Sequence, residues 1–384
     1  MTRAIFLAFA AAMAADMSLA GEYPATNFES VPSAENAQIA EQVELTGKLM
    51  ALRYGAGAGE TMARRAVHPK AHGCVKARFT VNSDLPEKFR VGVFATPGKS
   101  YPAWIRFSNA TAVIAPDVND KKADSRGMAI KLMGVEGETL LDEPGGKTQD
   151  FLLINQPMFA FPDVAEYLAF TRIQLEKKDN AKEIFPVFLT PPTPQRLKIL
   201  EIVTKVIQPT QLANPLDADY FTGSPFLFGK DHAAKFAARP RNPATPSPTP
   251  ENPSTDYLRE ALQRSLKGPD ARPVVFDFQV QLRPDGLQPL DPDYPIEVAN
   301  TEWKPKADGT AGYQNVATIV IDPQDIDNPL QATECEHLVL TPWHGLKDHR
   351  PLGGINRLRR DVYIASAKRR TQTAEPTGFP RWPQ

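Results

Sequence analysis

Apolar residues recur along this chain at two different spacings, and the two spacings predict helices in some segments and strands in others. A helix-like spacing of three or four positions marks three segments, residues 34–53, 164–174 and 194–207. We therefore expect helices at these three places, with the first of them near the N-terminus.

Shorter apolar runs between polar or turn-forming residues predict strands. Six segments have this pattern: 75–81, 103–108, 127–133, 150–155, 273–282 and 314–321. Four of them fall within about eighty residues, which favours one sheet that is interrupted by helices and then resumes. The expected fold class is α+β.

Residues 240–253 are rich in Pro, Ser, Thr and Asn, a composition that favours turns or extended chain and cannot bury a core. Such a segment marks either a domain boundary or a long surface loop. We favour the loop because the strands on its two sides look like two halves of one sheet. Residues 21–384 are therefore expected to form a single domain.

The first twenty residues have the pattern of a secretory signal peptide. Arg3 provides the positive start, residues 4–15 form a short apolar run, and Ser18-Leu19-Ala20 offers a cleavage site. An uncleaved anchor is the alternative. No later stretch approaches about 18 apolar residues, so we expect no integral membrane span and a secreted or periplasmic protein.

The charge balance narrows the choice of partner. The chain has 44 Lys and Arg residues against 45 Asp and Glu, a formal net charge of -1. This balance gives no sign of a nucleic-acid partner or an anionic membrane surface. A small-molecule ligand is expected instead.

The two cysteines, Cys74 and Cys335, leave several possibilities open. They could form a disulfide in an oxidising compartment if the fold brings them together. Alternatively, they could join nearby histidines in a zinc site, with ligands drawn from His68, His72, Cys74, Cys335 and His337. No Cys-x-x-Cys-His run is present, so covalently attached haem is not indicated.

Four short motifs follow one another along the chain: Arg65-Ala-Val-His68, Trp104-Ile-Arg106-Phe-Ser108, Asp124-Ser-Arg-Gly127 and Arg359-Arg-Asp-Val-Tyr363. Together they resemble the haem catalases, in which Arg-x-x-His, Arg-Phe-Ser, Asp-x-Arg-Gly and Arg-x-x-x-Tyr runs occur in this order. The resemblance covers roughly residues 64–370, with low similarity at 174–273. It implies a catalase-type antiparallel β-barrel with surrounding helices.

The resemblance also implies a haem b cofactor with His68 on one face and Tyr363 as the axial iron ligand on the other. A neutral imidazole such as that of His68 can take a proton from one peroxide oxygen and return it to the other. Ser108 is expected to hydrogen-bond the histidine ring and fix its tautomer. An anionic tyrosine oxygen stabilises oxidised iron.

Further residues are assigned to the cofactor by the same resemblance. Arg359 lies one helical turn before Tyr363 and would favour the ionised phenol. Arg65, Arg106 and Arg370 are expected to pair with the haem propionates, since the guanidinium fork suits carboxylates. Phe161 is expected to pack on the porphyrin face.

The sequence departs from the family pattern in one respect. Most catalases have a distal Asn-Thr-Pro run at the entry of the strand that here begins near Gln149, whereas this chain has Lys147-Thr148-Gln149. We therefore expect Thr148 to replace the asparagine in positioning peroxide. The chain is also shorter than typical catalases, which favours a more open site and a monomer or homodimer.

The leading hypothesis is a haem-dependent peroxidase or catalase-like enzyme that uses a small peroxide and an unknown electron donor. One alternative is an exported haem-binding protein with negligible turnover. Another is a fatty-acid hydroperoxide lyase or isomerase, which would need no external reductant.

Overall fold

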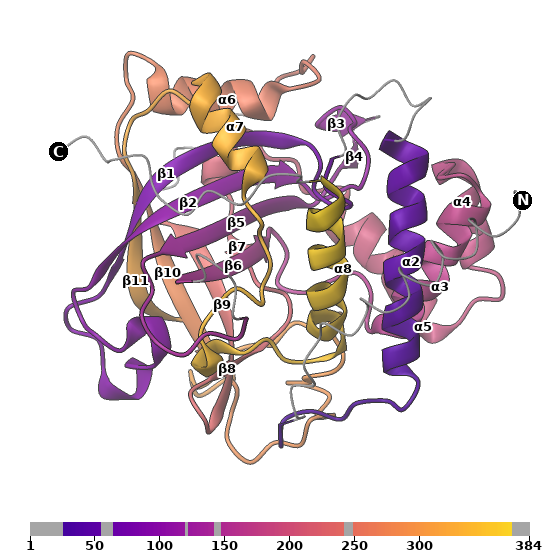
Figure 1. The fold of residues 1–384 in the computed structure, drawn as a ribbon, viewed down its shortest axis with the longest axis horizontal. Coiled ribbons are helices and arrows are strands. Elements are labelled where there is room, and N and C mark those ends of the chain that lie inside the picture. Colours follow the sequence, from indigo (N-terminus) through magenta and orange to yellow (C-terminus); the bar gives the residue numbers. More distant parts are fainter. Residues whose placement is uncertain (1–25, 55–63, 120–121, 142–146, 242–248, 371–384) are drawn as a thin grey trace, which may run out of the picture.

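The computed structural model describes residues 26–54, 64–119, 122–141, 147–241 and 249–370 (Figure 1). The predicted signal peptide at residues 1–20 lies outside the described residues, and the predicted loop 240–253 is described only at its two ends. No helix among the described residues is long and apolar enough to cross a membrane.

Eight antiparallel strands close into a barrel. In order around the barrel they are β10 (Val274–Leu282), β11 (Gln314–Ile321), β1 (Ala71–Val81), β2 (Ser100–Asn109), β5 (Arg126–Met133), β6 (Thr148–Ile154), β7 (Tyr220–Phe221) and β9 (His232–Pro240). The barrel closes because β10 pairs with β9 as well as with β11. The predicted α+β fold with an antiparallel barrel is confirmed.

The remaining short strands lie beside the barrel. Strand β8 (Phe226–Phe228) pairs with β9, and β3 (Val118–Asn119) pairs with β4 (Lys122–Ala123) in a separate ribbon. These strands leave the closed order of the eight barrel strands unchanged.

Aromatic side chains fill the barrel interior. Alternate residues of β1 point inward, and Phe79 is among them. Its ring lies 5.1 Å from that of Phe278 across the barrel, and Phe151 lies 4.9 Å from Phe236. The interior is therefore a packed core, and any ligand site must lie outside it.

Three long helices pack together along one side of the barrel: α2 (Glu35–Tyr54), α3 (Val164–Glu176) and α8 (Gly354–Arg370) (Figure 1). Asp163 begins α3 by accepting a hydrogen bond from the backbone N–H of Glu166. The other helices are α4 (Ala181–Phe188), α5 (Pro194–Glu201), α6 (Tyr257–Lys267) and α7 (Pro329–His337). A π-helical stretch, Ile202–Ile207, continues α5.

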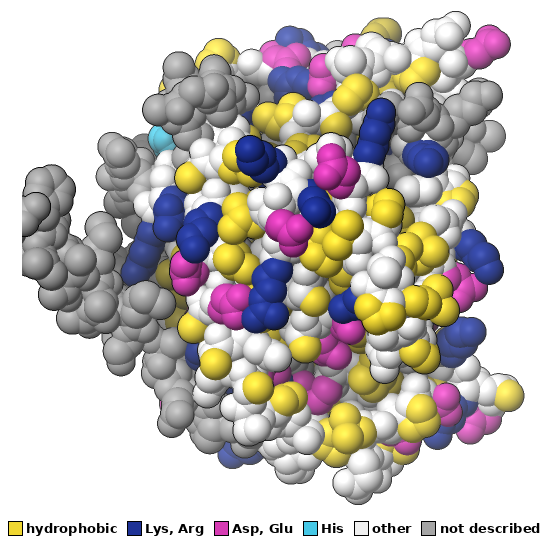
Figure 2. Space-filling view, turned by 90° about the vertical axis from the view of Figure 1, so that its right-hand side faces the viewer, with side chains coloured by type: hydrophobic (Ala, Val, Ile, Leu, Met, Phe, Trp, Pro, Cys, Tyr) yellow, Lys and Arg dark blue, Asp and Glu magenta, His cyan; other side chains and the backbone are white. Residues whose placement is uncertain are grey.

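Acidic and basic side chains are interspersed on the face that carries the α3–α5 helices (Figure 2). Many form ion pairs there, such as Arg172 with Glu41 at 2.6 Å and Lys205 with Glu201 at 3.0 Å. This face therefore presents no extended field of one sign.

A buried ion cluster centred on Arg357 fixes the start of α8. Its guanidinium contacts Glu29 at 2.6 Å, Glu35 at 2.5 Å and Glu297 at 2.7 Å. These carboxylates come from the N-terminal segment, from α2 and from the loop after β10. The cluster thus joins α8 to three parts of the chain that are distant in sequence.

Cys74 of β1 and Cys335 of α7 form a disulfide, which decides the question that the sequence left open. A disulfide sulfur is not a thiolate, so neither cysteine can serve as a zinc ligand. The described residues also contain no group of three or more His, Cys, Asp or Glu side chains that could hold a metal ion. The structure therefore does not support the zinc alternative.

His349 lies inside the aromatic core and makes stability depend on pH. Burial lowers the pKa of its imidazole from 6.5 to about 4. Between these values the unfolded chain binds the extra proton, so folding stability falls as the pH drops from 6.5 towards 4. One such group contributes up to about 1.4 kcal/mol per pH unit.

We expect His349→Gln to make the unfolding free energy less dependent on pH in this window than it is in the wild type. Urea unfolding at pH 4.5, 5.5 and 6.5 measures the difference. An identical pH dependence in the two proteins would show that His349 takes up its proton equally in the folded and unfolded states.

Candidate active site

One pocket lies between the barrel wall, the segment before β1 and α8, with an empty volume of about 730 Å³ that includes space open to solvent. Its walls are largely apolar on the barrel side, where Met128, Leu152 and Ile154 line it. Its polar lining residues are His68, Ser108, Tyr363, Ser366 and four arginines, Arg65, Arg106, Arg359 and Arg370.

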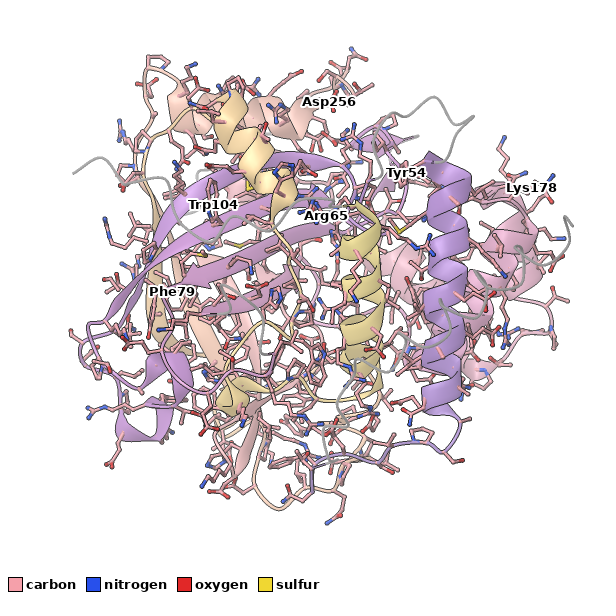
Figure 3. The ribbon with its side chains drawn as sticks, viewed as in Figure 1. Tyr54, Arg65, Phe79, Trp104, Lys178 and Asp256 are labelled. Atoms are coloured by element: carbon pink, nitrogen blue, oxygen red, sulfur yellow. A yellow bond between two sulfur atoms is a disulfide. The ribbon has the colours of Figure 1, made fainter. Side chains whose placement is uncertain are left out.

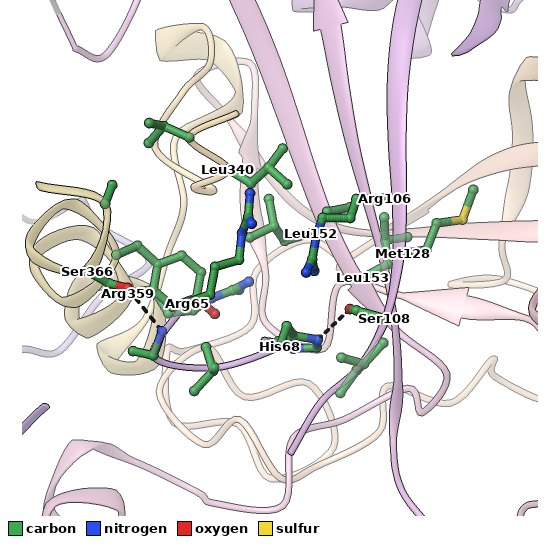
Figure 4. A pocket seen from close by; sticks show the side chains of 18 of the residues that line it. Arg65, His68, Arg106, Ser108, Met128, Leu152, Leu153, Leu340, Arg359 and Ser366 are labelled. Carbon is green, nitrogen blue, oxygen red and sulfur yellow. Dashed lines mark hydrogen bonds between the residues drawn. The ribbon is translucent and has the colours of Figure 1, made fainter. Parts of the chain in front are cut away.

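His68 is held in an unusual backbone conformation at one wall of the pocket. Its φ of 57° lies in the left-handed region, which non-glycine residues seldom adopt and which is often found at functional sites. The ring Nδ1 shares a 2.9 Å hydrogen bond with Ser108 Oγ of β2 (Figure 4). This bond fixes the ring orientation and leaves Nε2 as the nitrogen that can act on a ligand.

Gly127 of β5 makes room for this arrangement. A Cβ atom at Gly127 would lie 2.6 Å from His68 Nδ1 and 2.9 Å from Ser108 Oγ. Glycine is thus required by the close approach of the imidazole to the strand. The glycine of the Asp-x-Arg-Gly motif therefore has a physical role in the pocket.

The His68 imidazole stays neutral in this setting. Burial, and then the positive charges of Arg106 and Arg359, lower its pKa from 6.5 to about 3. A neutral imidazole near pH 7 can accept a proton at Nε2 and give it back. The arginines around the pocket therefore keep His68 in its basic form.

Tyr363 enters the same pocket from α8, one helical turn after Arg359. The Arg359 guanidinium lies 5.3 Å from the centre of the Tyr363 ring and 5.4 Å from that of Phe159. Its Nη1 donates to Asn356 Oδ1 at 3.1 Å, which holds it in place. Arg359 is therefore a fixed cation beside the Tyr363 ring in the pocket.

Three further arginines line the same pocket; Figure 3 shows where Arg65 lies in the fold, and Figure 4 shows Arg65 and Arg106 from close by. Arg65 comes from the segment before β1, Arg106 from β2 and Arg370 from the end of α8. Glu336 of α7 contacts this group, with Oε2 at 2.8 Å from Arg65 Nη1. Guanidinium groups that line a pocket suit a ligand with carboxylates of its own.

Two predicted site residues do not line this pocket. Thr148 is buried at the opposite end of β6 from Leu152, about 13 Å away along the strand at 3.3 Å per residue. Phe161 packs instead against Tyr167, Phe170 and Phe188 between the helices. Their expected roles are therefore corrected, and Phe159 is the phenylalanine that lines the pocket.

The structure brings an asparagine near the pocket that the sequence comparison overlooked. Asn155 directly follows pocket-lining Ile154, and its Oδ1 accepts a 2.6 Å hydrogen bond from the backbone N–H of Arg126. Its buried Nδ2 has no hydrogen-bond partner among the described residues. A donor left unpaired in this way is available to a bound molecule.

The pocket therefore combines apolar walls, a phenol oxygen, a neutral imidazole and several arginines. A sequence model of the family described as Catalase matches residues 50–187, the part of the chain that contains His68, Arg106 and Ser108.

Solved catalases share the fold of the whole chain. A fungal catalase, catalase A from Saccharomyces cerevisiae and a bacterial catalase match it with TM-scores of 0.62, 0.62 and 0.60 and identities of 14%, 16% and 18%. Each match covers 92% of this chain, and 66%, 68% and 64% of the respective catalase. The chain thus spans about two thirds of their length. The matched segment is similar to the catalase family, and the solved structures show that the chain has the fold of catalases.

We expect Gly127→Ala to break the hydrogen bond between His68 and Ser108, because the added Cβ overlaps the imidazole. Overpacking of this kind also costs about 1–3 kcal/mol of stability. Ring nitrogen shifts measured by ¹⁵N NMR should change as they do in Ser108→Ala.

Gly312→Ala is the matched control, since a Cβ there meets no atom closer than 3.4 Å. If Gly127→Ala keeps the wild-type nitrogen shifts, the close packing of His68 on β5 is wrong.

Proposed function

We propose that this protein is a haem-dependent, catalase-like enzyme that reduces hydrogen peroxide or organic hydroperoxides. The observation that carries the proposal is that His68 and Tyr363, from opposite ends of the chain, line one pocket with an arginine cluster. A pocket with both a neutral acid–base group and an oxygen ligand suits peroxide chemistry at iron.

The residues present fit haem b. Tyr363 Oη would ligate the iron, Arg359 would favour its anionic form, and Arg65, Arg106 and Arg370 would bind the propionates. Met128, Leu152 and Phe159 would contact the ring. Non-covalent binding agrees with the two cysteines being joined to each other. When bound, the haem supplies the electrons that cleave the oxygen–oxygen bond.

His68 would carry the proton in this reaction. Its neutral Nε2 takes the proton of the peroxide oxygen nearer the cofactor and returns it to the departing oxygen. For this step Nδ1 must hold the ring proton and donate it to Ser108 Oγ. Because burial, with the arginine charges, lowers the pKa of His68 to about 3, the imidazole stays unprotonated well below neutral pH.

Asn155 is the residue that we propose for positioning peroxide, in place of Thr148. Its free Nδ2 can donate a hydrogen bond, whereas Thr148 lies at the far end of β6. An asparagine beside the pocket supplies the type of donor that the sequence pattern at Lys147-Thr148-Gln149 lacks. Enzymatic turnover is therefore favoured over a haem carrier with negligible turnover.

We further propose that the protein is exported and acts with a small organic electron donor as a monomer or homodimer. The Cys74–Cys335 disulfide supports export, because such bonds persist in oxidising compartments. The interspersed charges and the open pocket support a small, diffusible donor rather than a nucleic acid or a membrane surface.

We expect Tyr363→Phe to lose haem or to shift its Soret band, because the ligating oxygen is removed. Absorption spectra of haem-reconstituted protein measure this. Tyr167→Phe is the matched control, since Tyr167 packs beside Tyr363 but does not line the pocket. A wild-type spectrum in Tyr363→Phe would contradict the ligand assignment.

We expect Asn155→Ala to lower the turnover of hydrogen peroxide and of an organic hydroperoxide about tenfold, the effect of one lost hydrogen bond. Thr148→Val should leave turnover close to wild type. Steady-state assays with and without a reductant measure both variants. Negligible wild-type turnover would favour the carrier, and product formation without any reductant would favour a lyase or isomerase.

A further inference from the structure

The last turn of α7 lies against the arginine cluster and binds it through backbone carbonyls. Arg65 Nη2 donates to the carbonyl oxygens of Leu338 at 2.8 Å and Cys335 at 3.3 Å. Arg370 donates to the same Leu338 oxygen at 3.0 Å and to the carbonyl of Glu336. The carboxyl end of a helix carries partial negative charge, so these contacts are favourable.

Glu336 adds a full negative charge to this contact. Its Oε2 lies 2.8 Å from Arg65 Nη1, and its Oε1 lies 3.5 Å from Arg106 Nε. Burial raises the pKa of its carboxyl, but the charges of the nearby arginines, Arg106 foremost, outweigh burial and lower the pKa to about 2. Glu336 is therefore ionised at any pH at which the protein would work.

The position of Glu336 relative to the pocket shows what it does. Arg65, Arg106 and Arg370 all line the pocket, whereas Glu336 does not, and about 31% of its side chain faces solvent. It thus contacts the arginines without lining the pocket itself. Its negative charge offsets the repulsion between the Arg65 and Arg106 guanidinium groups.

The disulfide holds this turn of α7 in register with the barrel. Cys335 precedes Glu336 directly, and its partner Cys74 is the cross-strand neighbour of Arg106. Gln331 of α7 adds a 2.8 Å hydrogen bond to the Cys74 carbonyl. Glu336 and Arg106 are therefore both held next to Cys74 of β1, Glu336 through the disulfide and Arg106 through strand pairing.

We propose that Glu336, carried on the disulfide-anchored end of α7, is a positioning residue that holds Arg65 and Arg106 ready for the carboxylates of a pocket ligand. The inference rests on the proposed function, because it takes haem as the ligand of the pocket. It adds a role for a residue outside the four motifs and for the Cys74–Cys335 bond.

The first test compares binding of haem with binding of haem dimethyl ester, in which both carboxylates are blocked. We expect Glu336→Gln to raise the Kd for haem at least tenfold and to leave the Kd for the ester unchanged, since only haem uses the arginines. Glu138→Gln is the control, because Glu138 pairs with Lys347 at an exposed position. Equal weakening for both ligands, or unchanged haem affinity, would overturn the proposal.

A second test needs no cofactor. Phenylglyoxal labels accessible guanidinium groups, and peptide mass spectrometry locates the product. In the ligand-free protein we expect Arg65 to be labelled several times faster in Glu336→Gln and in Cys74→Ala/Cys335→Ala than in wild type. Labelling of Arg357, which has its own carboxylates, should not change.

The two tests separate the proposals. If the wild type binds neither haem nor its ester, the proposed function fails, but the labelling rates still decide whether Glu336 positions the arginines. If Arg65 is labelled equally fast in wild type and Glu336→Gln, the positioning role is wrong whatever the protein binds. Because Glu336→Gln keeps the disulfide, this outcome does not depend on the folding of the double cysteine variant.

Discussion

The ion cluster around Arg357 is the interaction on which the site depends, because it determines where α8 lies. One guanidinium holds three buried or nearly buried carboxylates, and removal of one partner from a buried pair costs about 3–5 kcal/mol. Arg359, Tyr363 and Arg370 all follow on the same helix. A small rotation of α8 would take these side chains out of the pocket while leaving the barrel intact.

The second wall of the pocket is rigid for a different reason. The barrel interior is filled with aromatic rings, so the strands cannot move inward to follow a displaced ligand. Ser108 and Gly127 are neighbours in the β2–β5 ladder, and His68 packs on them. The site therefore lies between the rigid barrel wall and helix α8, which the ion pairs of Arg357 hold in place.

One distribution of charge serves two purposes in this pocket. The arginines that line the pocket suit the carboxylates of a proposed ligand, and together with burial they lower the pKa of His68. A cluster of like charges is costly to bury, and Glu336 together with the carbonyl groups at the end of α7 reduces that cost. The disulfide, the helix terminus and the acid–base histidine are thus parts of one electrostatic arrangement.

The sequence predicted much of this protein because several signals are local. Strands β1, β2, β5, β6, β10 and β11 and helices α2 and α3 follow from apolar spacing. Strand β9 was missed because its His-Ala-Ala-Lys-Phe-Ala-Ala-Arg run lacks β-branched residues and gains its stability from pairing with β10. Most of the polar residues that line the pocket were predicted from the order of the four motifs. Such motifs indicate the chemistry of the side chains but not where they lie in space.

Tertiary structure alone decided the other features. Cys74 and Cys335 are separated by 261 positions in the sequence, so whether they meet depends on how the intervening chain folds back to β1. No local sequence pattern encodes the distance between the two sulfur atoms. Leu152 and Ile154 lie at the end of β6 that meets the pocket, whereas Thr148 lies at the other end of the strand. Asn155, Phe159 and Glu336 matter because of what lies beside them in space. The sequence by itself determined the fold class and the kinds of side chain available, and packing decided which of them share a site.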